Sequence, residues 1–277
     1  MFLCKCTHPN ESRASKNVVI TGSTKGLGKA IAKKFFLDGN NVVINSRSKA
    51  NTLSTYQEFL KLSKHNPDSG AVYPIYADVT LYEDCERLIN MSLLKLGDID
   101  IWINNAGVST KEKLIQLEKK DIDAIVNTNL KGTMYCCNLL IPLLSENNII
   151  INVEGAGSNT FPTPNYSVYG STKAGVTQFT KTLTKEYADT NIIFCTISPG
   201  MVITDLLLSN CTDDMKKAFN IFAETPEKIA EFLVNRIYKI KSNTSIRYLT
   251  VMRIFVLSVL YMFKRYRNFD KKGNLRT

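Results

Sequence analysis

Short runs of β-branched and other apolar residues alternate along this chain with longer segments whose apolar residues recur at helical spacing. The first run, Asn17–Thr21, precedes a helical pattern from Lys29 to Asp38. The pattern predicts further strands at 41–45, 72–77, 99–103, 148–153 and 192–197, and helices at 50–65, 82–96 and 121–144, around Tyr169, and from Pro226 onward. Such alternation predicts an α/β fold with a doubly wound parallel sheet in a single domain.

Glycines interrupt the pattern where the first strand should meet the first helix. They let the backbone turn tightly and approach a pyrophosphate, whose charge the helix N-terminus stabilises. A glycine turn in this position predicts a Rossmann-type dinucleotide site. All seven residues of the turn are candidate cofactor contacts: Gly22, Ser23, Thr24, Lys25, Gly26, Leu27 and Gly28.

The residues after the second predicted strand indicate which dinucleotide binds. NAD-specific sites usually place a carboxylate there for the ribose 2′-hydroxyl, whereas this chain has Ser46, Arg47 and Ser48. Arg47 and Lys25 can pair with a 2′-phosphate, and the two hydroxyls can donate to it, so we expect NADPH as the cofactor. The alternative is that both cations face solvent.

Other candidate contacts lie at the ends of later strands. The ligand crevice of a doubly wound sheet lies at the carboxyl ends of its strands. The residues expected there are Asp78, Val79, Asn105, Ala106 and Gly107.

Three polar residues after the N-N-A-G motif are candidates for catalysis. Asn129 lies in the otherwise apolar helix predicted at 121–144, where a structural hydrogen bond is the alternative to a catalytic role. Tyr169 and Lys173 are four residues apart and share one helix face. A nearby cation stabilises a phenolate and lowers the Tyr pKa toward the range of efficient proton transfer, which makes Tyr169 a candidate general acid. A solvated helix face is the alternative.

The order of these motifs resembles the short-chain dehydrogenase/reductase superfamily over roughly residues 17–240. The motifs are T-G-x-x-x-G-x-G, N-N-A-G, an Asn in the next helix, Y-x-x-x-K and P-G-x-x-x-T. Within the superfamily, residues 154–158, 169–173, 198–208 and 246–250 look like those of the chlorophyll(ide) b reductases of plants and algae. Those enzymes reduce the ring formyl group of chlorophyll b to a hydroxymethyl.

The resemblance implies roles for the candidate residues. Tyr169 would be the proton donor, Lys173 would hold the nicotinamide ribose and lower the Tyr pKa, and Asn129 would position a water. The P-G-x-x-x-T motif adds four candidate cofactor contacts, which are Pro199, Gly200, Val202 and Thr204.

One position departs from the superfamily pattern. The Ser that polarises the substrate carbonyl normally lies thirteen residues before the Tyr, and here that position holds Ala156. Ser158 is the nearest hydroxyl. The Gly-Ala-Gly loop would let Ser158 reach the carbonyl, and a turn or capping role is the alternative.

Composition excludes several other classes of protein. The chain has 277 residues, 44% hydrophobic and 22% charged, which is ordinary for a globular domain. Its seven cysteines form no C-x-x-C pair, so we expect neither a disulfide framework nor a metal site. Aromatic and basic residues do not interleave in the core pattern as they would in a nucleic-acid platform, so we expect no nucleic-acid partner.

The net charge of +10 lies at the C-terminal end. From Arg236 onward the only acidic residue is Asp270, and the apolar run Ile254–Phe263 lies between basic flanks that include Lys264, Arg265 and Arg267. That run is too short to span a bilayer, which needs about 20 residues. We therefore expect a basic amphipathic tail at a membrane surface; packing on a second subunit or on the domain's own core are alternatives.

The expected domain organisation is an N-terminal tail at 1–16, the dehydrogenase domain at 17–240 and the C-terminal extension at 241–277. The motifs predict NADPH-dependent reduction of a carbonyl on a bulky lipophilic substrate, and the resemblance implies the formyl group of chlorophyll(ide) b. Retinal, a steroid or a sphingoid ketone is the alternative substrate, and a non-catalytic NADPH-binding scaffold is the alternative function. We expect a homo-oligomer. If the resemblance holds, it is located in a plastid as a peripheral membrane protein; otherwise it is located in the cytoplasm or at the cytoplasmic face of a membrane.

Overall fold

The structure is a computed structural model that describes residues 14–158, 162–205, 213–263 and 268. For residues 213–217, 262 and 263 it describes the backbone only. Lys264, Arg265 and Arg267 of the predicted basic tail lie outside the described residues.

Seven parallel strands form one twisted sheet in the order β3-β2-β1-β4-β5-β6-β9. The chain starts in the middle, moves outward to β3 and then returns to the other side of β1, so the topological switch point lies between β1 and β4. The strands are β1 Asn17–Ile20, β2 Asn41–Ser46, β3 Val72–Tyr76, β4 Ile101–Asn104, β5 Ile149–Val153, β6 Ile193–Ser198 and β9 Thr244–Arg247.

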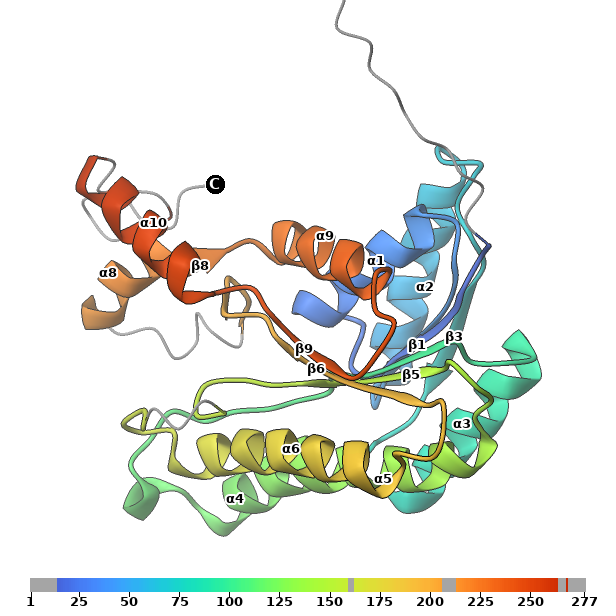
Figure 1. Cartoon of the computed structure of the whole chain (residues 1–277), viewed down its shortest axis with the longest axis horizontal. Helices are drawn as coiled ribbons and strands as arrows, with labels where there is room; N and C mark the ends of the chain where they lie inside the picture. Colours follow the sequence, from blue (N-terminus) through green and yellow to red (C-terminus); the bar gives the residue numbers. More distant parts are fainter. Residues whose placement is uncertain (1–13, 159–161, 206–212, 264–267, 269–277) are drawn as a thin grey trace, which may run out of the picture.

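Helices cover both faces of this sheet (Figure 1). Because both faces are buried, the central strands are nearly continuous apolar runs, as the predicted pattern required. One layer contains α1 Gly26–Leu37, α2 Lys49–Ser63 and α9 Pro226–Ile237. The other contains α3 Tyr82–Leu96, α4 Lys119–Val126, α5 Gly132–Leu140 and α6 Ser167–Glu186. The predicted doubly wound fold is confirmed.

The remaining elements lie near the carboxyl ends of the strands. Two short strands, β7 Met201–Val202 and β8 Ala223–Glu224, pair with each other outside the main sheet. Helix α8, Asp213–Phe222, precedes β8 and contacts α10, Val251–Phe263.

Two predicted features differ from the structure. The single helix predicted at 121–144 is broken into α4, a π-helical segment at Asn127–Lys131, α5 and a short 3₁₀ turn at Ile141–Leu143. The sequence predicts that residues 241–277 form a C-terminal extension outside the domain, yet part of this segment forms β9, which pairs with β6 in the main sheet, with Ile246 opposite Ile197. Pairing with a distant strand is not visible in the local pattern of such a short segment.

Candidate active site

The glycine turn lies at the switch point and packs against the loop that follows β4. The backbone of Gly22 has a φ of +62°, and a Cβ there would lie 2.8 Å from Ala106 Cα. Asn105 Nδ2 donates to the carbonyl oxygens of Thr21 and Gly22 at 2.9 and 3.0 Å. A Cβ at Gly28 would lie 2.3 Å from that same amide nitrogen. These contacts leave room only for hydrogen at two glycines, and they keep the backbone accessible to a phosphate group.

The P-G-x-x-x-T motif reaches the same turn. Pro199 is buried, and Gly200 has a φ of +72°. After β7, which contains Val202, the Thr204 side chain approaches the glycine turn, because a Cβ at Gly26 would lie 3.1 Å from Thr204 Cγ2. The structure therefore brings together three of the predicted motifs, which are far apart in the sequence.

The end of β2 fits the adenosine half of an NADP cofactor. Arg47 and Lys25 are both exposed, and neither belongs to an ion pair that involves the described residues. Ser48 caps the N-terminus of α2 by accepting from Asn51 N at 3.3 Å. Two available cations beside a helix N-terminus suit a phosphate, and the fingerprint carboxylate for NAD is missing here.

Some predicted contacts are used inside the protein. Ser23 is buried, donates to Ile20 O at 2.7 Å and accepts from Asn45 N at 2.8 Å, so its hydroxyl supports the turn. Asp78 Oδ1 accepts from the N–H and the hydroxyl of Thr80 at 3.0 and 2.9 Å, which closes the turn after β3. Both side chains thus stabilise the loops at the carboxyl ends of the strands. Of the remaining residues of this group, Thr24 lies in the glycine turn and Ser46 ends β2, whereas Leu27 of α1 and Val79 are buried in the core.

Asn129 is held in place by three hydrogen bonds. Its Oδ1 accepts from Val108 N at 2.8 Å, and its Nδ2 donates to Val108 O at 2.9 Å and to Thr172 Oγ1 at 3.2 Å. Asn129 lies in the π-helical segment, a feature that is frequent at functional sites. A Cβ at Gly107 would lie 3.4 Å from Asn129 Oδ1 and 3.8 Å from Lys173 Nζ, so this loop touches both predicted catalytic residues.

Tyr169 and Lys173 project from α6 toward the loop that follows β5. Lys173 is buried, and its Nζ donates to Val153 O at 2.9 Å. The Nζ lies 5.9 Å from the centroid of the Tyr169 ring, so the two side chains are neighbours without a direct hydrogen bond. Burial lowers the pKa of Lys173 to about 8, against the opposing effect of the Glu154 carboxylate.

The pKa of Tyr169 is raised, not lowered as the sequence predicted. Burial of the half-buried Tyr169 side chain, together with the neighbouring Tyr166 phenol, raises the pKa of Tyr169 to about 12. The Lys173 ammonium lies beside the ring but does not offset this shift, which burial and Tyr166 determine. Tyr169 therefore keeps its proton across the neutral pH range, which is the form that a proton donor needs.

The backbone of Gly155, one residue before the position of the missing Ser, lies against the Tyr169 hydroxyl. A Cβ at Gly155 would lie 2.3 Å from Tyr169 Oη, while Ala156 is exposed. Ser158 Oγ donates to Gly155 O at 2.7 Å and lies 3.5 Å from Glu154 Oε2. In this structure Ser158 makes the turn contact that was the alternative to a catalytic role.

Sequence reasoning gave Glu154 no role, although the structure places this buried carboxylate at the centre of the site. Its Oε1 accepts from Thr177 Oγ1 at 3.2 Å, and its Oε2 lies 3.7 Å from Arg247 of β9. The carboxylate also raises the pKa of Lys173 against the effect of burial. A charged residue directly after the apolar strand at 149–153 was the signal that could have identified it.

No group of three or more His, Cys, Asp or Glu residues that could hold a metal ion occurs in the described part of the chain.

Comparisons with known proteins agree with this arrangement. Residues 16–214 match the family described as short chain dehydrogenase. A solved short-chain dehydrogenase from Burkholderia cenocepacia, in complex with NADP, superposes with a TM-score of 0.73 over 84% of this chain and 95% of its own, at 21% identity. That likeness concerns the fold.

Two plant proteins and one bacterial protein are similar in sequence. The chain is 41% identical to the probable chlorophyll(ide) b reductase NYC1 of Arabidopsis thaliana over 93% of its length and 55% of the plant protein's. It is 39% identical to chlorophyll(ide) b reductase NOL of the same plant, covering 86% of this chain and 71% of that protein. The 3β-hydroxysteroid dehydrogenase 1 of Eggerthella lenta is 32% identical, over 73% of this chain and 77% of its own. The chain thus spans about half the length of the NYC1 proteins that it matches.

Proposed function

This chain belongs to the short chain dehydrogenase family, and we propose that it uses NADPH to reduce a carbonyl group on a bulky lipophilic substrate. The observation that carries the proposal is the position of Tyr169 and Lys173 on α6, beside the loops that also contact Asn129 and the glycine turn. Bound NADPH would supply the hydride. The exposed cations Arg47 and Lys25 would hold its 2′-phosphate.

The residues of the chain would supply the proton and hold the reactants. The phenol of Tyr169 donates its proton to the carbonyl oxygen as negative charge develops there. Lys173 holds the ribose and, in its protonated form, stabilises the phenolate that is left. Asn129 fixes the loop at Val108 and through Thr172 stays in contact with α6. With Ser158 turned onto its own loop, carbonyl polarisation falls mainly to Tyr169.

We propose the formyl group of chlorophyll(ide) b as the substrate carbonyl. The support is the similarity to the two plant reductases, which covers most of this chain. A plastid location would accompany this substrate, since both relatives are described as chloroplastic. A steroid is the second candidate, supported by the similarity to a bacterial hydroxysteroid dehydrogenase. A homo-oligomer stays a prediction.

The reaction and the substrate need separate tests. Tyr169→Phe should reduce turnover at least about 10³-fold while the Kd for NADPH, measured by nucleotide fluorescence, changes little, because the phenol acts in the chemical step. Full residual activity would remove Tyr169 from the mechanism. Chromatography of parallel NADPH reactions with chlorophyll b, retinal, a 3-ketosteroid and a 3-keto sphingoid base would identify the substrate. Product from none of them, with NADPH still bound, would favour the scaffold alternative.

A further inference from the structure

Helix α10 is an apolar helix that the rest of the described protein does not cover. Arg253 is its only charged residue, yet none of the side chains described for it is buried. Val251, Met252 and Phe255 are 86%, 72% and 65% exposed, and Leu260 is 55% exposed. A helix that is apolar on all sides is normally buried in protein or in lipid. Apart from its contact with α8, this helix therefore leaves most of its apolar side chains uncovered by the described residues.

Contacts on both sides of α10 attach this helix to the rest of the fold. At its start, Arg253 donates to Tyr248 Oη at 2.5 Å, and its guanidinium lies 3.7 Å from the centroid of that ring. Beyond its end, Asn268 donates to the carbonyl oxygens of Phe219 and Ala223. In Figure 1 the arm formed by α8 and α10 projects from the end of the sheet where the strands have their carboxyl ends. The apolar surface is thus a fixed part of the fold.

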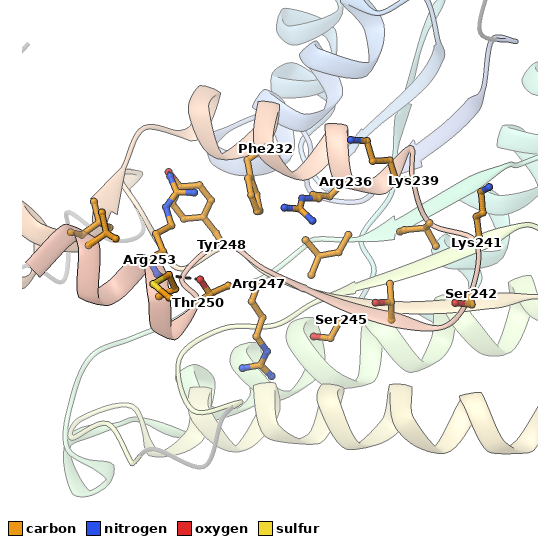
Figure 2. A pocket seen from close by; sticks show the side chains of 16 residues that line it. Phe232, Arg236, Lys239, Lys241, Ser242, Ser245, Arg247, Tyr248, Thr250 and Arg253 are labelled. Atoms are coloured by element: carbon orange, nitrogen blue, oxygen red, sulfur yellow. Dashed lines mark hydrogen bonds between the residues drawn. The ribbon is translucent and has the colours of Figure 1, made fainter.

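A basic groove of about 960 Å³ lies beside this surface, between α9, β9 and α10. Figure 2 shows Phe232 and Arg236 projecting from α9 toward β9, with Lys239 and Lys241 farther along the groove. Among the described residues that line it, none is an Asp or a Glu. The groove therefore suits anionic groups that are attached to an apolar body.

The charge of the surface excludes some occupants. In a symmetric contact with a second copy, the same basic patch would face itself, and like charges would repel. The C-terminal segment after α10 is itself rich in Lys and Arg, so it offers no complementary charge. A helix of 13 residues is roughly 20 Å long, which is shorter than the roughly 30 Å hydrocarbon core of a bilayer. No helix within the described ranges is both long and apolar enough to cross one.

We propose that α10 and the neighbouring basic groove form a docking surface for an anionic membrane. The exposed apolar side chains of α10 enter the boundary between headgroups and acyl chains, and the lysines and arginines of the groove meet the anionic headgroups. Helix α10 lies beyond the carboxyl ends of the strands, the end of the sheet that also carries the glycine turn and the loop after β5. Docking there would present a membrane-dissolved substrate to the site.

The test is sedimentation of the full chain with vesicles, without NADPH or substrate, so that its result is independent of the proposed reaction. We expect binding to phosphatidylglycerol/phosphatidylcholine vesicles and much weaker binding to phosphatidylcholine alone. Met252→Asp/Phe255→Asp should lower the partition coefficient at least about tenfold, because two inserted side chains become charged. Lys239→Gln/Lys241→Gln should lower it roughly fivefold per lysine at low salt, and less at high salt because the attraction is screened.

Matched variants control for general effects. Leu94→Asp changes a leucine on α3 that is as exposed as Met252. Lys61→Gln/Lys64→Gln removes two positive charges at the C-terminal end of α2, as many as Lys239→Gln/Lys241→Gln removes from the groove. Both should bind vesicles like the wild type, and all four variants should keep the unfolding temperature of the wild type. Absence of wild-type binding to anionic vesicles would overturn the proposal. So would equal losses in the control variants, or a Met252→Asp/Phe255→Asp protein that changes from dimer to monomer in light scattering while its vesicle binding is unchanged.

Discussion

The substitution Gly155→Ala adds a single methyl group, and we expect it to impair catalysis while the protein still folds. Its φ is outside the left-handed region, so alanine meets no backbone strain there. A Cβ at this position would lie 2.3 Å from Tyr169 Oη and 3.1 Å from Lys173 Cγ. Protein Cβ contacts below 3.0 Å essentially do not occur. In Gly155→Ala, the phenol or the loop must therefore move by about 0.7 Å or more.

The size of the effect follows from this displacement. A misplacement of about 1 Å can cost roughly 10²-fold in rate, so we expect kcat to fall about 10- to 100-fold, or about 1.4 to 2.7 kcal/mol in the activation free energy. Replacing glycine by alanine also restricts the unfolded chain, which stabilises a protein by about 0.4–1 kcal/mol where the native conformation permits. The assays are steady-state NADPH oxidation, NADPH titration by fluorescence and thermal unfolding.

Gly170→Ala provides the matched control one residue after Tyr169. A Cβ at Gly170 would lie 3.7 Å from its nearest neighbour, Gly157 Cα, which is an ordinary contact. Because alanine favours a helix over glycine by about 1 kcal/mol, this variant should be more stable and keep kcat within about threefold. If Gly155→Ala kept the kcat of the wild type, or if Gly170→Ala lost as much kcat as Gly155→Ala, the conclusion that the Tyr169 hydroxyl donates the proton from its position beside Gly155 would be refuted.

Two further predictions concern pH and cofactor choice. The value of kcat/KM for NADPH should fall as pH rises through about 8, because Lys173 then loses its proton while Tyr169, with a pKa of about 12, stays protonated. Glu154→Gln should move this decline to lower pH, since the Glu154 carboxylate raises the pKa of Lys173; an unmoved decline would contradict its role. Arg47→Asp should lower the ratio of kcat/KM for NADPH to that for NADH by roughly 10- to 100-fold, because a carboxylate repels the 2′-phosphate. An unchanged ratio would mean that the phosphate binds elsewhere.

The features that were predictable from the sequence are those with a local cause. Helix α3 has the predicted bounds Tyr82–Leu96, because Gly97, with a φ of +81°, ends it. Helix α9 begins at Pro226 as predicted, because the preceding Thr225 caps it by accepting from Lys228 N. The glycine turn could be identified because a strand, a tight turn and a helix follow one another without a gap.

Features that depend on distant contacts could not be predicted. A π-helical segment at Asn127–Lys131 has nearly the same apolar spacing as an α-helix, so the pattern does not show it. The pKa of Tyr169 depends on burial by the β5 loop, which the spacing of Tyr169 and Lys173 does not report. Ser158 turns onto Gly155 because its loop is tight, and sequence left this role open beside the catalytic one.

The buried charges beside α6 are better explained by function than by stability. Burying ions costs more free energy than burying apolar side chains of similar size, so Lys173 and Glu154 inside this domain would not be retained for stability alone. Glu154 lies between Lys173 and Arg247, and its negative charge opposes the loss of the lysine proton. Arg247 ends β9, only four residues before α10 begins. The last strand thus connects the proposed membrane-docking surface, through the Arg247–Glu154 ion pair, to the carboxylate that raises the pKa of Lys173 against the effect of burial.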